Sequence, residues 1–216
     1  MVVMKLFVEG GGDAKTLRTA CREGFTEFLK KAGLLGYMPR VVPCGSRKNA
    51  YDDYCIALRN GEAAMLLIDS EDSVAPALLV VNKDDSVKTA QPWVHLQNRT
   101  GDKWTKPINA NDVHCHLMVQ CMEAWFLTDR QMLQTFFGQG FNVNALPSTA
   151  NPIEEVTKSK IYQSLADATK NCKTKAPYGK GEHSFKLLAL IDPSKVTTSS
   201  RWAKRFVDEM KQQMGC

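Results

Sequence analysis

Cysteine pairs and long apolar runs are both missing from this sequence. Its seven cysteines are scattered, odd in number and without a CxxC pair, so we expect free thiols and a reducing, cytoplasmic setting. The apolar run Met1 to Val8, interrupted by Lys5, is too short for the core of a signal peptide and is typical of a strand. No stretch approaches the length of a membrane span, so we expect no membrane partner.

A strong excess of one charge and low-complexity segments are missing as well. Hydrophobic residues make up 44% and charged residues 24% of the chain, which is ordinary for a folded globular protein and argues against disorder. The 28 basic and 23 acidic side chains leave a net charge of +5. This moderate surplus suits a polyanionic partner such as nucleic acid but does not identify one.

The first half of the chain alternates strand and helix patterns. Apolar, β-rich runs predict four strands, at residues 2–8, 37–44, 63–68 and 113–119. Amphipathic segments between them predict helices, the first capped by Asp13 and ended by Gly33, the second over residues 46–58, and another after the fourth strand through Glu123 and Leu133. This alternation predicts an α/β fold, a parallel sheet with helices on both faces.

The 216 residues suffice for one large domain with an appendage. We expect an α/β domain over residues 1–137, with a partly structured insert at about 73–112, and a helical C-terminal extension over residues 138–216. The last helix of the extension carries one apolar stripe, formed by Trp202, Phe206, Val207 and Met210. Such a stripe covers the sheet or joins two copies in a homodimer, and we expect it to pack on the same domain.

Acidic residues follow the first and third predicted strands at the points where these strands end. Glu9 comes after the first strand with Asp13 four residues later, and the third strand runs into Asp69, Glu71 and Asp72. Because the carboxyl ends of parallel strands meet at one edge of a sheet, we expect these acids to lie together. They would repel one another unless a cation lay between them, and oxygen ligands favour Mg²⁺ or Mn²⁺.

Two more groups belong to the same predicted edge. Glu123 follows the fourth strand and is either a further metal ligand or a solvated glutamate in the first turn of a helix. Ser46, Arg47 and Lys48 follow the second strand, where cations and backbone amides would hold a phosphate. Metal ligands beside a phosphate site indicate phosphoryl chemistry.

The acidic motifs resemble the signature of the Toprim (topoisomerase–primase) family, a glutamate after the first strand and a DxD after the third. Here they read Glu9 and Asp69-Ser70-Glu71. The spacing from Glu9 to Asp13 is most similar to nucleases of the OLD type (overcoming lysogenisation defect). It is even more similar to small stand-alone Toprim-like proteins encoded beside ABC/SMC-type ATPases in phage-defence loci. Further matches to that group are Cys44-Gly45-Ser46-Arg47, Glu123-Ala124-Trp125-Phe126-Leu127, Tyr178-Gly179-Lys180-Gly181 and Ser184-Phe185.

This resemblance implies a Toprim-like fold and a metal-dependent endonuclease that hydrolyses phosphodiester bonds in DNA or RNA. It further implies an effector of anti-phage defence that is controlled by an ATPase partner. Glu9 would anchor the catalytic metal, Asp69 and Glu71 would complete its ligation, and Asp13 would support a second metal. Because the DxD motif is DxE here, either Glu71 or Asp72 fills the second acidic role.

By the same resemblance, a basic residue would neutralise charge in the transition state. The candidates are Lys180, Lys186 and His183, of which His183 is also a candidate phosphate ligand. Two other functions stay open. The Asp69-x-Glu71 motif loosely resembles the aspartyl nucleophile motif of haloacid-dehalogenase enzymes, which would make the protein a phosphohydrolase of small phosphate esters. The other is a non-catalytic Toprim-like adaptor that binds an ATPase or nucleic acid.

Overall fold

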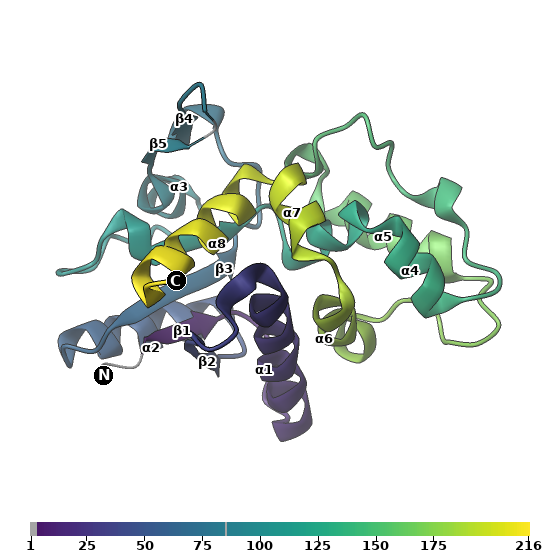
Figure 1. Ribbon diagram of the computed structural model, residues 1–216, viewed down its shortest axis with the longest axis horizontal. Helices are drawn as coiled ribbons and strands as arrows, with labels where there is room; N and C mark the ends of the chain where they lie inside the picture. Colours follow the sequence, from purple (N-terminus) through teal and green to yellow (C-terminus); the bar gives the residue numbers. More distant parts are fainter. Residues whose placement is uncertain (1–3, 85) are drawn as a thin grey trace.

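A parallel sheet of four strands forms the centre of the computed structural model, which describes residues 4–84 and 86–216 (Figure 1). The strands lie in the order β2-β1-β3-β6 and span Arg40–Pro43, Lys5–Val8, Ala64–Asp69 and Cys115–Met118. All three pairings between them are parallel. The predicted α/β class is therefore confirmed, while Val2 and Val3 of the first predicted strand lie outside the described residues.

Helices cover both faces of this sheet because successive strand side chains point to opposite sides. Leu6 and Val8 of β1 belong to one buried cluster with Phe28 of helix α1, Lys15–Leu29. Phe7, between them, belongs to a second cluster with Tyr54 of helix α2, Arg47–Arg59. Every residue of β3 is buried, as the apolar run 64–68 predicts for a strand covered on both faces, and its last residue, Asp69, is buried as well.

The segment between β3 and β6 folds into small elements of its own. It contains a 3₁₀ turn, a two-stranded hairpin and a helix, namely Pro76–Leu78, β4 (Leu79–Val81) with β5 (Val87–Ala90), and α3 (Pro92–Asn98). Trp93 and Leu96 of α3 are buried in the cluster that holds Tyr54. The insert is thus anchored on the same face as α2.

The C-terminal part is helical, and its last helices lie against the sheet and α1 (Figure 1). After α4 (Arg130–Phe137) come four helices, α5 (Lys158–Thr169), α6 (Lys180–Leu190), α7 (Pro193–Ser199) and α8 (Arg201–Met214). The apolar stripe of α8 is buried, and this helix packs against β6. In the described part of the chain, no helix has both the length and the apolar character needed to cross a bilayer.

Two local predictions are wrong. Asp13 does not cap α1, because Ala14 is the N-cap residue and no side chain bonds the first turn. Glu123 is not in an α-helix but in a 3₁₀ helix, Met122–Thr128. The α-helix begins later because the Asp129 side chain accepts a hydrogen bond from the Met132 N–H and starts α4 there.

A buried glycine brings α1 and α6 close together, and these two helices form the most extensive contact between elements. A Cβ at Gly24 of α1 would lie 2.8 Å from the carbonyl oxygen of Phe185 in α6. Only glycine leaves room for that approach. The close packing fixes the first turn of α6, with Lys180 and Gly181, beside the strand ends described below.

Replacing Gly24 with alanine therefore has an unusual expected effect. Gly→Ala inside a helix ordinarily stabilises by roughly 0.5–1 kcal/mol. We expect Gly24→Ala to lower the free energy of unfolding by more than about 1 kcal/mol instead, because the added methyl group forces α6 away from α1. Urea denaturation measures the change. The matched control is Gly181→Ala in α6, where a Cβ would meet only Leu17 Cδ2, at 4.0 Å, among residues 4–84 and 86–216. A Gly24→Ala variant at least as stable as the wild type would contradict the packing described.

Candidate metal centre

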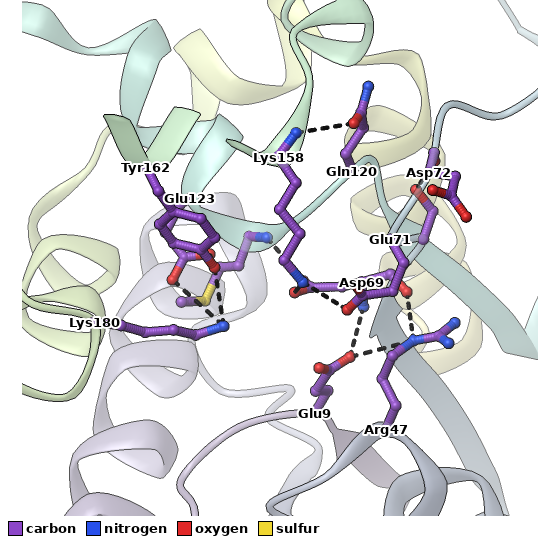
Figure 2. A network of polar contacts seen from close by, with 12 residues as sticks. Glu9, Arg47, Asp69, Glu71, Asp72, Gln120, Glu123, Lys158, Tyr162 and Lys180 are labelled. Atoms are coloured by element: carbon purple, nitrogen blue, oxygen red, sulfur yellow. Dashed lines mark hydrogen bonds and ion pairs between the residues drawn. The ribbon is translucent and has the colours of Figure 1, made fainter. Parts of the chain in front are cut away.

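Three carboxylates meet where the neighbouring strands β1 and β3 end (Figure 2). Glu9 follows β1, Asp69 is the last residue of β3, and Glu71 lies two residues further on. One carboxylate oxygen from each lies within 4.8 Å of the others, and we call this set the acidic trio. It forms at the point where the chain order of the sheet reverses, the position at which open α/β sheets bind ligands.

Backbone groups hold the trio in place. Glu9 Oε2 accepts a hydrogen bond of 3.1 Å from the Asp69 N–H, and Asp69 Oδ1 accepts one of 2.8 Å from the Met122 N–H. Glu71 adopts a left-handed backbone with φ 67°, and its N–H donates to the Gln120 carbonyl at 2.9 Å. Such a conformation costs a non-glycine residue about 1–3 kcal/mol and persists only where the surroundings fix it.

Two cations of the protein lie against the trio. Lys158 reaches in from the start of α5, with Nζ 2.6 Å from Glu71 Oε1 and 3.5 Å from Asp69 Oδ2 (Figure 2). Arg47 donates from Nε to the Asp69 carbonyl at 2.9 Å and lies 3.6 Å from Glu9 Oε2. Arg47 is one of the predicted phosphate ligands. Lys158 was not predicted, because it lies 87 positions after Glu71 and nothing in its local sequence marks it.

Burial opposes the ionised form of two members of the trio, Glu9 and Asp69. Burial raises the pKa of Glu9, nearby Asp69 raises it further, and Arg47 opposes both. Burial also raises the pKa of Asp69, with a further rise from Glu123 and opposition from Lys158. A cation held between the carboxylates would offset this cost, because an opposite charge favours the ionised form.

Glu123 lies beside the trio in a separate network of hydroxyl groups. Its fully buried carboxylate accepts hydrogen bonds from Tyr162 at 3.0 Å, Ser184 at 3.1 Å and Tyr178 at 3.3 Å. Lys180 Nζ lies 3.9 Å from it. All four partners come from the C-terminal part of the chain, so Glu123 anchors that part to the strand ends rather than facing solvent from a helix.

Besides Glu123, two other acids of the predicted metal site, Asp13 and Asp72, lie outside the trio. The Asp13 side chain is fully exposed and lies 3.8 Å from Arg18. Asp72 is 66% exposed and pairs with Arg99 at 2.8 Å. Of the two alternatives left open by the DxE motif, the structure thus brings Glu71 into the trio and turns Asp72 away from it.

Of the residues after β2, only Arg47 reaches the trio. Ser46 is used as the N-cap of α2, where its hydroxyl accepts a hydrogen bond from the Asn49 N–H at 3.1 Å. Lys48 is largely exposed and pairs with Asp52 one turn along the helix. The local sequence could not distinguish these roles, because all three residues sit in or before the same first turn.

Of the three basic candidates in α6, only Lys180 lies near the trio. Its Nζ lies 3.0 Å from the Tyr162 hydroxyl. His183 is buried, with its Nδ1 accepting a hydrogen bond from the Gly179 N–H and its ring against Phe137, and burial lowers its pKa. This arrangement corrects its expected role as a phosphate ligand, since the neutral ring stabilises the start of α6. Lys186 is exposed and does not line the cavity beside the trio.

That cavity has a volume of about 240 Å³ and opens between the turn after β1 and the first turn of α6. Glu9, Asp69, Glu123 and Lys180 all contribute to its walls. The trio is therefore open to a small ligand from one side. Together, the carboxylates and nearby cations can hold a metal ion next to an anion such as phosphate.

The raised pKa values of Glu9 and Asp69 predict how stability depends on pH. Without metal, the folded state holds protons on these carboxyls that the unfolded state has already released, so stability falls as pH rises from the unfolded values toward the raised folded values. We expect a loss of roughly 1–3 kcal/mol between about pH 5 and pH 8, smaller in Glu9→Gln and smaller with saturating Mn²⁺. Urea denaturation of chelator-treated protein at each pH measures this loss. If stability instead rose from pH 5 to pH 8, and rose by the same amount in Glu9→Gln, the raised pKa values of Glu9 and Asp69 would be contradicted.

Comparisons with known proteins place the chain in a family. No curated protein and no solved structure matches it. The family model described as "Domain of unknown function (DUF4276)" matches residues 8–211. This range includes the acidic trio, Arg47, Lys158 and the Glu123 network. The chain therefore belongs to the DUF4276 family.

Proposed function

We propose that the protein is a metal-dependent, Toprim-type endonuclease that hydrolyses phosphodiester bonds in DNA or RNA. The observation that carries the proposal is the acidic trio, three carboxylates gathered at two adjacent strand ends. A donor set made only of oxygen atoms fits Mg²⁺ or Mn²⁺ and does not favour zinc. The resemblance of Glu9 and Asp69-x-Glu71 to the Toprim signature supports a nuclease among the enzymes that use such ions.

Each residue near the trio has a separate role in this proposal. Glu9, Asp69 and Glu71 would hold the ion, which supplies Lewis-acid stabilisation of the reacting phosphate when bound. Arg47 is nine-tenths buried and would hold Asp69 in place beside the ion, because its Nε donates to the Asp69 carbonyl while its Nη1 pairs with Asp102. Lys158 and Lys180 would neutralise charge beside the trio. Lys186 is exposed and outside the cavity, which argues against such a role for it.

The cellular role is proposed from the resemblance alone. We propose a cytoplasmic effector of anti-phage defence whose activity an ABC/SMC-type ATPase controls. Co-expression with an ABC/SMC-type ATPase, followed by the cleavage assay described below, tests this part separately.

A non-catalytic adaptor is the second candidate, and one observation favours it. Lys158 and Arg47 already neutralise much of the charge of the trio through contacts at 2.6 to 3.6 Å. A cluster neutralised by the protein itself can serve folding alone. A phosphohydrolase of small phosphate esters is the third candidate, because the cavity beside the trio is small. The assays below separate all three.

The central assay is cleavage of plasmid DNA and tRNA by the purified protein with Mg²⁺, Mn²⁺ or EDTA. We expect metal-dependent cleavage that Glu9→Gln and Asp69→Asn each reduce by roughly 100-fold or more. Mutating a group that only orients a metal ligand already lowers activity by roughly 10- to 100-fold, and loss of the ligand itself should lower it at least as much. Asp13→Asn and Asp72→Asn are matched controls that remove the same charge outside the trio, and we expect them to keep near-normal activity.

Several outcomes would overturn the endonuclease. Cleavage in EDTA, or full activity of both trio variants, would exclude the metal mechanism. Hydrolysis of small phosphate esters without action on either polymer would favour the phosphohydrolase. No hydrolysis with or without the ATPase, combined with tight binding to it, would favour the adaptor.

Lys158 gives a second test, which needs no activity. Its ammonium group competes with a metal ion for Glu71 and Asp69, so we expect Lys158→Met to bind Mn²⁺ about tenfold more tightly. The metal-free variant should also unfold more easily, because the carboxylates then repel one another without compensation. Calorimetric titration and urea denaturation measure the two effects.

Lys160→Met is the matched control, since Lys160 is an exposed lysine on the same turn of α5. We expect it to change neither quantity. Weaker or unchanged Mn²⁺ affinity in Lys158→Met would contradict the proposed competition.

A further inference from the structure

The cavity beside the acidic trio is a candidate binding site in its own right. Glu9 and Asp69 form part of its wall, so a group bound in it would adjoin anything held at the trio. Its volume of about 240 Å³ lies below the roughly 300–1,000 Å³ of sites for drug-sized ligands. The cavity therefore suits one compact group attached to a phosphate and is too small for a stretch of polymer.

The walls of the cavity are largely apolar. Leu17, Met122 and Phe185 contribute apolar side chains from three separate elements. The turn Gly10-Gly11-Gly12 contributes backbone alone, and all three glycines have positive φ. A Cβ at Gly10 would lie 3.0 Å from Phe185 Cζ, so this wall depends on glycine. Narrow sites with apolar walls are typical of those that hold a nucleobase taken out of its stack.

Polar groups complete the lining on the α6 side. Lys180 offers an ammonium group, and its side chain is 55% exposed, so it can move. Glu123 forms part of the same wall, but its fully buried carboxylate is taken up by three hydroxyl groups. A nucleoside carries acceptors, on its base and its sugar, that match the cation.

We propose that this cavity binds a single unstacked nucleoside next to the phosphate held at the acidic trio. The inference rests on the proposed function and deepens it, because it names the form of the substrate. A base stacked within a continuous duplex cannot enter a closed site without being extruded. The substrate is thus a single strand, a frayed end or a loop, and a free nucleotide is a minimal ligand.

Gly181 provides a way to fill the cavity without touching the trio. It lines the cavity from α6, and within the described residues the only atom within 4 Å of a Cβ placed there is Leu17 Cδ2 at 4.0 Å. Its backbone is helical and does not require glycine. Alanine at this position leaves most of the space open, whereas leucine extends into it.

The test measures binding of thymidine 5′-monophosphate, adenosine 5′-monophosphate and methyl phosphate by calorimetry at saturating Mn²⁺. We expect the wild type to bind the nucleotides about tenfold or more tightly than methyl phosphate, and Gly181→Ala to keep that preference. In Gly181→Leu the dissociation constants of all three ligands should lie within about twofold of one another. Unchanged Mn²⁺ affinity of this variant would show that it is folded. Leu17→Phe fills the cavity from the opposite wall and should act in the same way.

A wild type without nucleotide preference, or a preference that survives Gly181→Leu and Leu17→Phe, would overturn the inference. A parallel arm compares cleavage of a single-stranded oligonucleotide with its duplex, and we expect faster cleavage of the single strand. Nucleotide binding that depends on side-chain size without any cleavage would support the cavity and refute the endonuclease. Metal-dependent cleavage at the wild-type rate in both Gly181→Leu and Leu17→Phe would support the endonuclease and refute nucleoside binding in the cavity.

Discussion

Three carboxylates, buried or half-buried, meet at the ends of β1 and β3 and repel one another when ionised. The parallel pairing of β1 with β3 forces Glu9 and Asp69 to neighbouring positions, and the left-handed turn at Glu71 adds a third acid. Burial raises the pKa of Glu9 and of Asp69, so their ionised forms are costly. Arg47 from α2 and Lys158 from α5 lower that cost, so two helices far apart in the chain are tied to one strand edge.

The C-terminal helices take part in the site as well as covering the fold. Three hydroxyl groups from this region hold the buried carboxylate of Glu123, and Lys180 lies beside it. Gly24 lets α6 approach α1 closely, which closes the cavity over the turn after β1. Without these helices the strand ends would be an open acidic surface. They would lack both the lysine cations and the cavity on which the proposed nucleotide chemistry rests.

The sequence predicted the parts of the site that depend on local pattern and strand order. Apolar runs marked the strands, and the acids after the first and third runs had to meet once the sheet was parallel. Lys158 could not be predicted, because its contact with Glu71 spans 87 positions and follows from how α5 packs. Asp13 and His183 were predicted as site residues because of their chemistry, but neither lies at the trio. The Asp13 side chain is exposed to solvent, and His183 is buried by packing.

The acidic trio is, in our proposal, a divalent-metal site that Lys158 neutralises until an ion binds. Anomalous scattering from crystals grown with Mn²⁺ tests this assignment. We predict a peak about 2.0–2.4 Å from one oxygen each of Glu9, Asp69 and Glu71, with Lys158 Nζ withdrawn from Glu71. The absence of a peak there at saturating Mn²⁺, with Lys158 still bound to Glu71, would contradict it.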